Sequence, residues 1–124
     1  TSGDHGTTYG GNPLATCAIN KVLDLFEESN IIENVREITP YFEKKLDEVA
    51  AKYDCILTRR GAGLMQGLVF DKPVGAIINK AIEKGLLLIN AGTNIIRFLP
   101  SLIITKKDID DMIVLLDEAI KETI

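Results

Sequence analysis

The strongest constraint on the fold is a long helical pattern between residues 32 and 53. Its apolar residues recur at steps of three or four, which places them on one face of an amphipathic helix. They are Ile32, Val35, Ile38, Phe42, Leu46, Val49 and Tyr53. Pro40 lies inside this pattern and is expected to kink or split the helix just before itself, because proline has no backbone N–H to donate. A chain of 124 residues is long enough to bury such a face in one core.

A second helix is predicted ahead of this pattern, from Pro13 to about Glu28. Asn12 is a favourable N-cap, and proline is favoured at the first helical position. The apolar residues of this segment cover more than one face of the helix. They are Leu14, Ala15, Ala18, Ile19, Val22, Leu23, Leu25 and Phe26. One small sheet does not need so much apolar surface, so we expect this helix to pack on something outside the chain.

Short strand-like runs follow the two helices. A hairpin is predicted where residues 55–60 and 64–70 flank the turn 61–63, because glycine stands at both ends of that turn. Residues 74–82 then have the spacing of a short amphipathic helix. Gly85 is a natural residue to end that helix.

Two more strands and a last helix are predicted for the rest of the chain. The apolar runs 86–89 and 95–99 read as strands separated by a turn. Thr105 and Asp108 resemble a capping box at the start of the last helix. This order of elements predicts an α+β fold, with a small, mostly antiparallel sheet and helices packed on one face.

Charge and cysteine content exclude several function classes. The net charge is −4 at neutral pH with no basic block, which argues against electrostatic binding of nucleic acid. No run of 18 apolar residues is present, so no membrane span is expected. Cys17, Cys55 and the single histidine, His5, lack the spacing of metal ligands, so we expect no metal site. Both cysteines are expected to be buried thiols in a reducing compartment.

Residues 1–12 form a glycine-rich polar segment that runs into the start of the first predicted helix. Its glycines allow the backbone to approach a ligand closely, and Thr7 and Thr8 supply hydroxyl donors. A helix N-terminus favours an anion. The segment lacks the Gly-Lys-Ser/Thr of a Walker A loop. From these residues alone, a phosphate-binding loop and a flexible terminal tail both remain open.

Four strings, in order along the chain, carry a resemblance to a known family. They are GDHGTTYGGNPLA at residues 3–15, RGAGLM at 60–65, GLLL at 85–88 followed by Asn90, and IRFLPSL at 96–102. Together they resemble the class III, ornithine-type aminotransferases, which use pyridoxal phosphate. Within that family they are most similar to the enzymes that act on N2-acetylornithine. The resemblance covers nearly the whole chain.

The resemblance implies that residues 1–28 are a phosphate-binding segment with an inter-domain linker helix, and that residues 29–124 are the C-terminal small domain. It implies transfer of an amino group between N2-acetylornithine and 2-oxoglutarate, in arginine biosynthesis, by a cytoplasmic homodimer. Ornithine, succinylornithine and 4-aminobutyrate aminotransferases share these motifs and remain alternatives. A stand-alone, non-catalytic binding or dimerisation module is the alternative of a different class.

The resemblance also places the lysine that carries the cofactor a short way upstream of Thr1. The chain is therefore expected to hold no catalytic residue and to be inactive alone. Thr8 matches the threonine that donates to the cofactor phosphate in the neighbouring subunit. Thr7 matches a position that lines the substrate pocket across the same interface. Arg97 matches an arginine that pairs with a glutamate of the large domain, near the substrate side chain.

Other polar residues receive structural interpretations. His5 is expected to belong to the loop structure rather than to act as a general base. Arg59 and Arg60 are expected to form a solvated strand edge. Met65 is expected to lie in the core.

Overall fold

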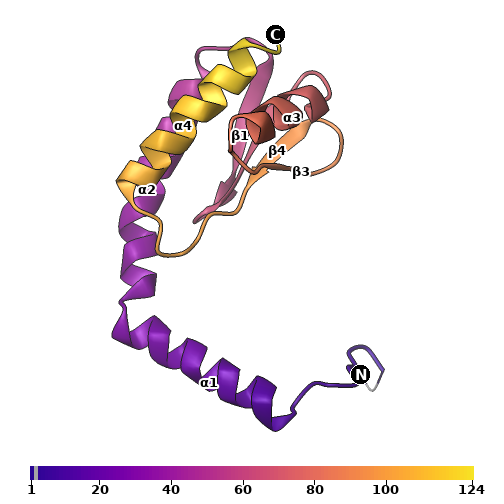
Figure 1. Cartoon of the computed structure of the whole chain (residues 1–124), viewed down its shortest axis with the longest axis vertical. Coiled ribbons are helices and arrows are strands. Elements are labelled where there is room, and N and C mark those ends of the chain that lie inside the picture. The colour runs from indigo at the N-terminus through magenta and orange to yellow at the C-terminus, as the bar shows by residue number, and fades with distance from the viewer. Residues whose placement is uncertain (2) are drawn as a thin grey trace. The chain divides into compact units, whose positions relative to one another are not determined.

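The computed structural model describes residue 1 and residues 3–124, and it divides the chain into two compact units, residues 1–32 and 33–124. The elements in chain order (Figure 1) are α1 (Pro13–Glu28), α2 (Ile31–Ala50), β1 (Ile56–Ala62), β2 (Met65–Phe70), α3 (Gly75–Glu83), β3 (Ile89–Asn90), β4 (Ile95–Phe98) and α4 (Lys106–Lys121). This confirms the α+β class. Among the described residues, no helix is both long enough and apolar enough to cross a membrane.

The four strands form one antiparallel sheet in the order β1-β2-β4-β3. Ala62 pairs with Met65, so the hairpin turn consists of Gly63 and Leu64, slightly later than the predicted turn at 61–63. Gly63 has a φ of +56°, a conformation that favours glycine. The predicted strand at 86–89 is wrong in position, because only residues 89 and 90 pair with β4.

One hydrophobic core joins the sheet to α2, α3 and α4. The predicted face of α2 supplies four buried residues: Ile38, Phe42, Leu46 and Val49. Phe42 meets Phe98 of β4 edge to face, with ring centroids 6.0 Å apart. The α4 helix lies alongside α2 (Figure 1), and Asp110 of α4 accepts from Tyr41 and pairs with Lys45 of α2.

Pro40 was predicted to kink or split the helix; the α2 helix continues through it, so the split does not occur. Ile38 and Phe42, on either side of the proline, are both buried. The carbonyl that proline leaves without its helical partner belongs to Arg36, an exposed residue. Packing on both sides of the proline therefore holds the helix together at a position where the lost bond faces water.

Two burial predictions are corrected by the structure. Cys55 is buried, but Cys17 is exposed, because no residue of α1 is buried. Met65 is 58% exposed, since it stands at the tip of the hairpin on the face of the sheet opposite the core. The exposed large apolar residues of α1 are Leu14, Ile19, Val22, Leu23 and Leu25.

The predicted capping box at the start of α4 is confirmed. The Thr105 hydroxyl accepts from the Asp108 N–H at 3.2 Å, and the Asp108 carboxylate accepts from the Thr105 N–H at 2.9 Å. Hydrogen bonds from the Thr105 side chain and then its backbone lower the pKa of Asp108.

We expect Thr105→Ala to lower the free energy of unfolding by about 1 kcal/mol, the usual contribution of an N-cap side chain. The Thr105→Ser variant keeps the hydroxyl and should retain most of that free energy. Urea denaturation of the chain followed by circular dichroism measures both. If Thr105→Ala and Thr105→Ser lowered the free energy of unfolding equally, the hydroxyl would contribute nothing to stability.

Candidate functional site

The glycine-rich segment forms a series of turns ahead of α1, and residues 3–12 are all exposed. Asn12 closes the segment: its Nδ2 donates to the Tyr9 carbonyl at 2.5 Å, and its Oδ1 accepts from the Ala15 N–H at 3.0 Å. A Cβ on Gly10 would lie 2.1 Å from the Cγ2 of Thr7. A side chain at position 10 would therefore force the Thr7 side chain into another rotamer.

The start of α1 is a poorer anion site than the sequence suggests. Pro13 has no N–H, and Asn12 already occupies the N–H of Ala15. Few helix donors are left for a bound anion. A phosphate held by this segment would depend mainly on side-chain hydroxyls.

Thr7 and Thr8 provide such hydroxyls. Both residues are exposed. Within the described part of the chain, neither hydroxyl takes part in a hydrogen bond. A free hydroxyl that donates to an anionic oxygen forms a charge-assisted hydrogen bond, which is stronger than a neutral one. The two exposed threonines therefore supply free hydroxyl donors of the kind that bind anionic oxygens.

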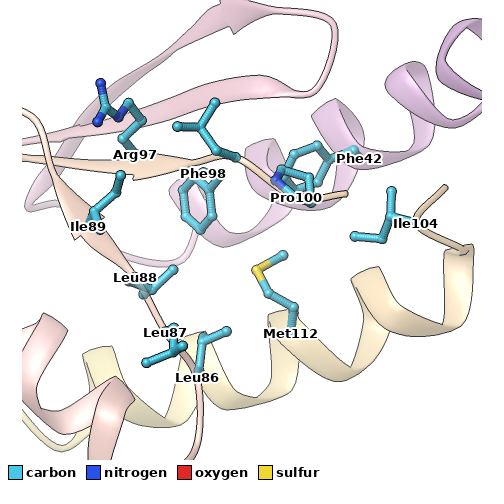
Figure 2. A pocket seen from close by; sticks show the side chains of 11 residues that line it. Phe42, Leu86, Leu87, Leu88, Ile89, Arg97, Phe98, Pro100, Ile104 and Met112 are labelled. Atoms are coloured by element: carbon cyan, nitrogen blue, oxygen red, sulfur yellow. The ribbon is translucent and has the colours of Figure 1, made fainter. Parts of the chain in front are cut away.

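Arg97 lies on β4, where it pairs in register with Gly67 of β2 and Ile89 of β3. Its stem borders an apolar cavity of about 310 Å³, whose walls include Leu87, Phe98 and Met112. In Figure 2 the guanidinium of Arg97 points away from Phe98 and from Met112 of α4. Arg97 and Phe98 are successive residues of a strand, so their side chains are expected to face opposite sides of the sheet. The positive charge is therefore held outside the apolar cavity.

A second cavity, of about 400 Å³, lies on the outer face of the sheet and also includes Arg97. Arg60 of β1 borders it as well, because Arg60 pairs with Gly67 and Gly67 pairs with Arg97. Residues directly opposite in antiparallel strands share a face of the sheet. The two arginines thus stand in one row on either side of a glycine. Sequence reasoning did not link them, because the pairing register joins positions far apart in the chain.

Arg59 lies on the opposite face and is half-buried, so the predicted solvated edge is correct for Arg60 and wrong for Arg59. Its Nε donates to Asp47 at 2.7 Å, and it also pairs with Glu43 at 3.4 Å. The hydrogen bond to Asp47 is the main cause that raises the pKa of the Arg59 guanidinium, beyond its already high value. These bonds tie the hairpin to α2.

Gln66 completes this network, and the sequence had not assigned it a role. It is 1% exposed, accepts from Arg59 at 2.9 Å, and donates to Glu43 at 3.1 Å and to the Gly63 carbonyl at 2.7 Å. The signal in the sequence that could have identified Gln66 was its polar side chain inside an otherwise apolar strand. Its bonds fix β2 against α2 and so fix the position of Gly67 between the two arginines.

The candidate residues belong to both units of the chain. Thr7 and Thr8 lie in the unit 1–32, and Arg97 lies in the unit 33–124. Each unit therefore presents its own group of candidate residues. His5 lies in a bend of the first unit.

Comparison with known proteins identifies relatives that match almost the full length of this chain. The family model described as aminotransferase class-III matches residues 1–120. The mitochondrial acetylornithine aminotransferase of Saccharomyces cerevisiae is 43% identical over 120 residues, which are 96% of this chain and 28% of that protein. The succinylornithine transaminase of Photorhabdus laumondii is 39% identical over 122 residues, which are 95% of this chain and 30% of that protein.

The fold has solved counterparts. The chain aligns with the crystal structure of acetylornithine aminotransferase from Elizabethkingia anophelis with a TM-score of 0.85 and 29% identity. The alignment covers 98% of this chain and 32% of that one. The chain spans about three-tenths of the length of the curated relatives it matches.

Proposed function

This chain belongs to the class-III aminotransferases, and on that basis we propose that it is the C-terminal part of an enzyme that exchanges an amino group between N2-acetylornithine and 2-oxoglutarate. The observation that carries the proposal is the 43% identity over 120 residues to the acetylornithine aminotransferase of yeast. In this proposal residues 1–28 form the phosphate-binding segment and linker helix, and residues 29–124 form the small domain. The pathway is arginine biosynthesis.

The cofactor is pyridoxal phosphate, on which this family of enzymes depends. When bound, it withdraws electrons from the amino-acid carbon and so allows the amino group to be exchanged. Thr8 donates its hydroxyl to the phosphate, and Thr7 contacts the substrate beside it. Support comes from the two exposed hydroxyls.

Arg97 binds the anionic part of the substrate or pairs with a carboxylate of the large domain. Its support is an exposed guanidinium that no carboxylate neutralises within the described residues. The enzyme works as a homodimer, in which the glycine-rich segment reaches the neighbouring subunit's site. No residue of α1 is buried within the chain. Its exposed apolar surface supports the proposal that another part of the enzyme packs on this helix. We place the enzyme in the cytoplasm, in line with its two free cysteines.

The test is to assay the full-length parent with four amino donors and 2-oxoglutarate as acceptor. We expect kcat/KM to be highest for N2-acetylornithine, above ornithine, succinylornithine and 4-aminobutyrate. The 124-residue chain alone should show no turnover, because the lysine that carries the cofactor lies upstream of Thr1 in this proposal.

Succinylornithine is the second candidate donor, because a succinylornithine transaminase is 39% identical to the chain. A higher kcat/KM for succinylornithine than for N2-acetylornithine would establish that alternative. Amino transfer by the chain alone would overturn the assignment of catalysis to the missing part.

A further inference from the structure

The side chain of Gln66 is buried on the side of the sheet that faces α2. Among the described residues it is the only polar or charged residue that is buried, with 1% of its surface exposed. Both ends of its amide are hydrogen-bonded: Oε1 accepts from Arg59 at 2.9 Å, and Nε2 donates to Glu43 at 3.1 Å and to the Gly63 carbonyl at 2.7 Å. A buried amide that loses its partners costs free energy. The amide therefore links α2, β1 and the hairpin turn at one buried point.

Two neighbours of the amide restrict its position. Arg59 is itself fixed to α2, because its Nε and Nη2 donate to the two carboxylate oxygens of Asp47 at 2.7 Å and 3.2 Å. Such a two-point contact holds the guanidinium plane in one orientation. In addition, a Cβ on Gly61 would lie 2.7 Å from the Oε1 of Gln66, so β1 passes close to the amide. The hairpin therefore has little freedom to move relative to α2.

The same hairpin forms one wall of the cavity on the outer face of the sheet. Residues 60–62 and 65–67 border this cavity of about 400 Å³, and Arg97 borders it from β4. Gln66 directly precedes Gly67, the residue of β2 that pairs with Arg97. Side chains of successive strand residues face opposite sides, so Gln66 acts on the outer face only through the backbone of the hairpin. A displacement of β2 relative to α2 would therefore change the cavity beside the Arg97 side chain.

We propose that Gln66 is a positioning residue, which holds the hairpin from the helix side and so sets the wall of the cavity beside Arg97. The inference rests on the proposed function, in which Arg97 binds an anionic part of the substrate or pairs with a carboxylate of the large domain. It adds that the action of Arg97 depends on a buried amide that touches neither substrate nor cofactor.

Steady-state kinetics of the full-length parent tests the proposal. Arg97→Gln first identifies the substrate, amino donor or 2-oxoglutarate, whose KM depends on Arg97. Gln66→Met removes the amide and keeps the size of the side chain; we expect it to raise the same KM about tenfold and to change kcat less, in line with the loss of hydrogen bonds to charged groups. Glu43→Ala removes one hydrogen bond at the partly exposed end of the network and should raise that KM about threefold.

A double-mutant cycle shows whether Gln66 acts through Arg97. In the Arg97→Gln background, Gln66→Met should no longer raise that KM. Ile120→Val is the matched control for stability, because Ile120 is buried in α4, which takes no part in the network. It should lower the free energy of unfolding and leave both KM values unchanged.

The outcomes separate this inference from the proposed function. Unchanged KM values in Gln66→Met and Glu43→Ala, or an increase that persists in the Arg97→Gln background, overturn the role of Gln66 even if the parent transfers amino groups as proposed. Unchanged KM values in Arg97→Gln overturn it as well. An increase that disappears in the Arg97→Gln background supports it, even if N2-acetylornithine proves to be the wrong donor. If Gln66→Met does not fold, Glu43→Ala provides the same comparison.

Discussion

Replacing Gly61 by alanine is expected to lower the free energy of unfolding of this chain by about 3 kcal/mol or more, from backbone strain and steric overlap together. Gly61 has a φ of +153°, which side-chain-bearing residues rarely adopt. An added Cβ would lie 2.2 Å from the Met65 carbonyl oxygen and 2.8 Å from the Cα of Gln66. Both atoms belong to the backbone of the partner strand, so they cannot move aside without breaking the hairpin register.

Two other glycines provide matched controls for this variant. Gly85 also has a positive φ, +87°, but a Cβ there would meet no described atom within 4 Å, so Gly85→Ala should cost only about 1–2 kcal/mol. Gly75 is helical with the same open space, and Gly75→Ala should be neutral or stabilising. Urea denaturation of the three variants gives the comparison. If Gly61→Ala and Gly85→Ala lowered the free energy of unfolding equally, the steric overlap predicted in the hairpin would contribute nothing to that free energy.

Helix boundaries were predictable where local chemistry sets them. The α1 helix begins at Pro13 because Asn12 caps it and proline fits the first position, and both signals are readable in the sequence. The capping box at Thr105 and Asp108 fixed the start of α4 in the same way. The face of α2 followed from periodicity, although periodicity could not show that packing on both sides of Pro40 would keep the helix whole.

Features that depend on strand pairing were predicted less well. Arg59 and Arg60 are neighbours with the same charge in a predicted strand, and the sequence does not tell which of them faces α2. In a strand, successive residues face opposite sides. Arg59 therefore joins Asp47 and Gln66 on the side of α2, while Arg60 shares the outer face with Arg97. The apolar pattern at 86–89 does not distinguish a paired strand from an extended segment that leads into a strand.

The burial of α1 could not be derived from its sequence either. Periodicity identifies an apolar face but does not supply the surface that covers it. Cys17 is exposed for this reason, since nothing in the described chain buries any residue of α1. The roles of Thr7, Thr8 and Arg97 come from motif resemblance and stay predictions.

Removing the hydroxyl of Thr8 in the full-length parent is expected to weaken the binding of pyridoxal phosphate by about 1.5–3 kcal/mol, the range for hydrogen bonds to charged groups. The cofactor dissociation constant should therefore rise roughly tenfold to a hundredfold. Thr8→Ser keeps the donor and should restore most of the affinity. Thr7→Ala is the matched neighbour: it should raise the KM for the substrate and leave cofactor affinity unchanged.

Titration of pyridoxal phosphate into the cofactor-free variants, followed by its absorbance, separates two ways in which this segment could hold a phosphate. If the helix N-terminus were the main anion site, Thr8→Ala would change little. The structure disfavours that alternative, because Pro13 has no N–H and Asn12 already accepts from the Ala15 N–H at 3.0 Å. With those two donors unavailable, a phosphate bound by this segment depends mainly on its hydroxyls, and the loss of affinity on Thr8→Ala should be large. An unchanged cofactor affinity would therefore refute the assignment of Thr8. It would mean that the phosphate is bound by donors outside this segment.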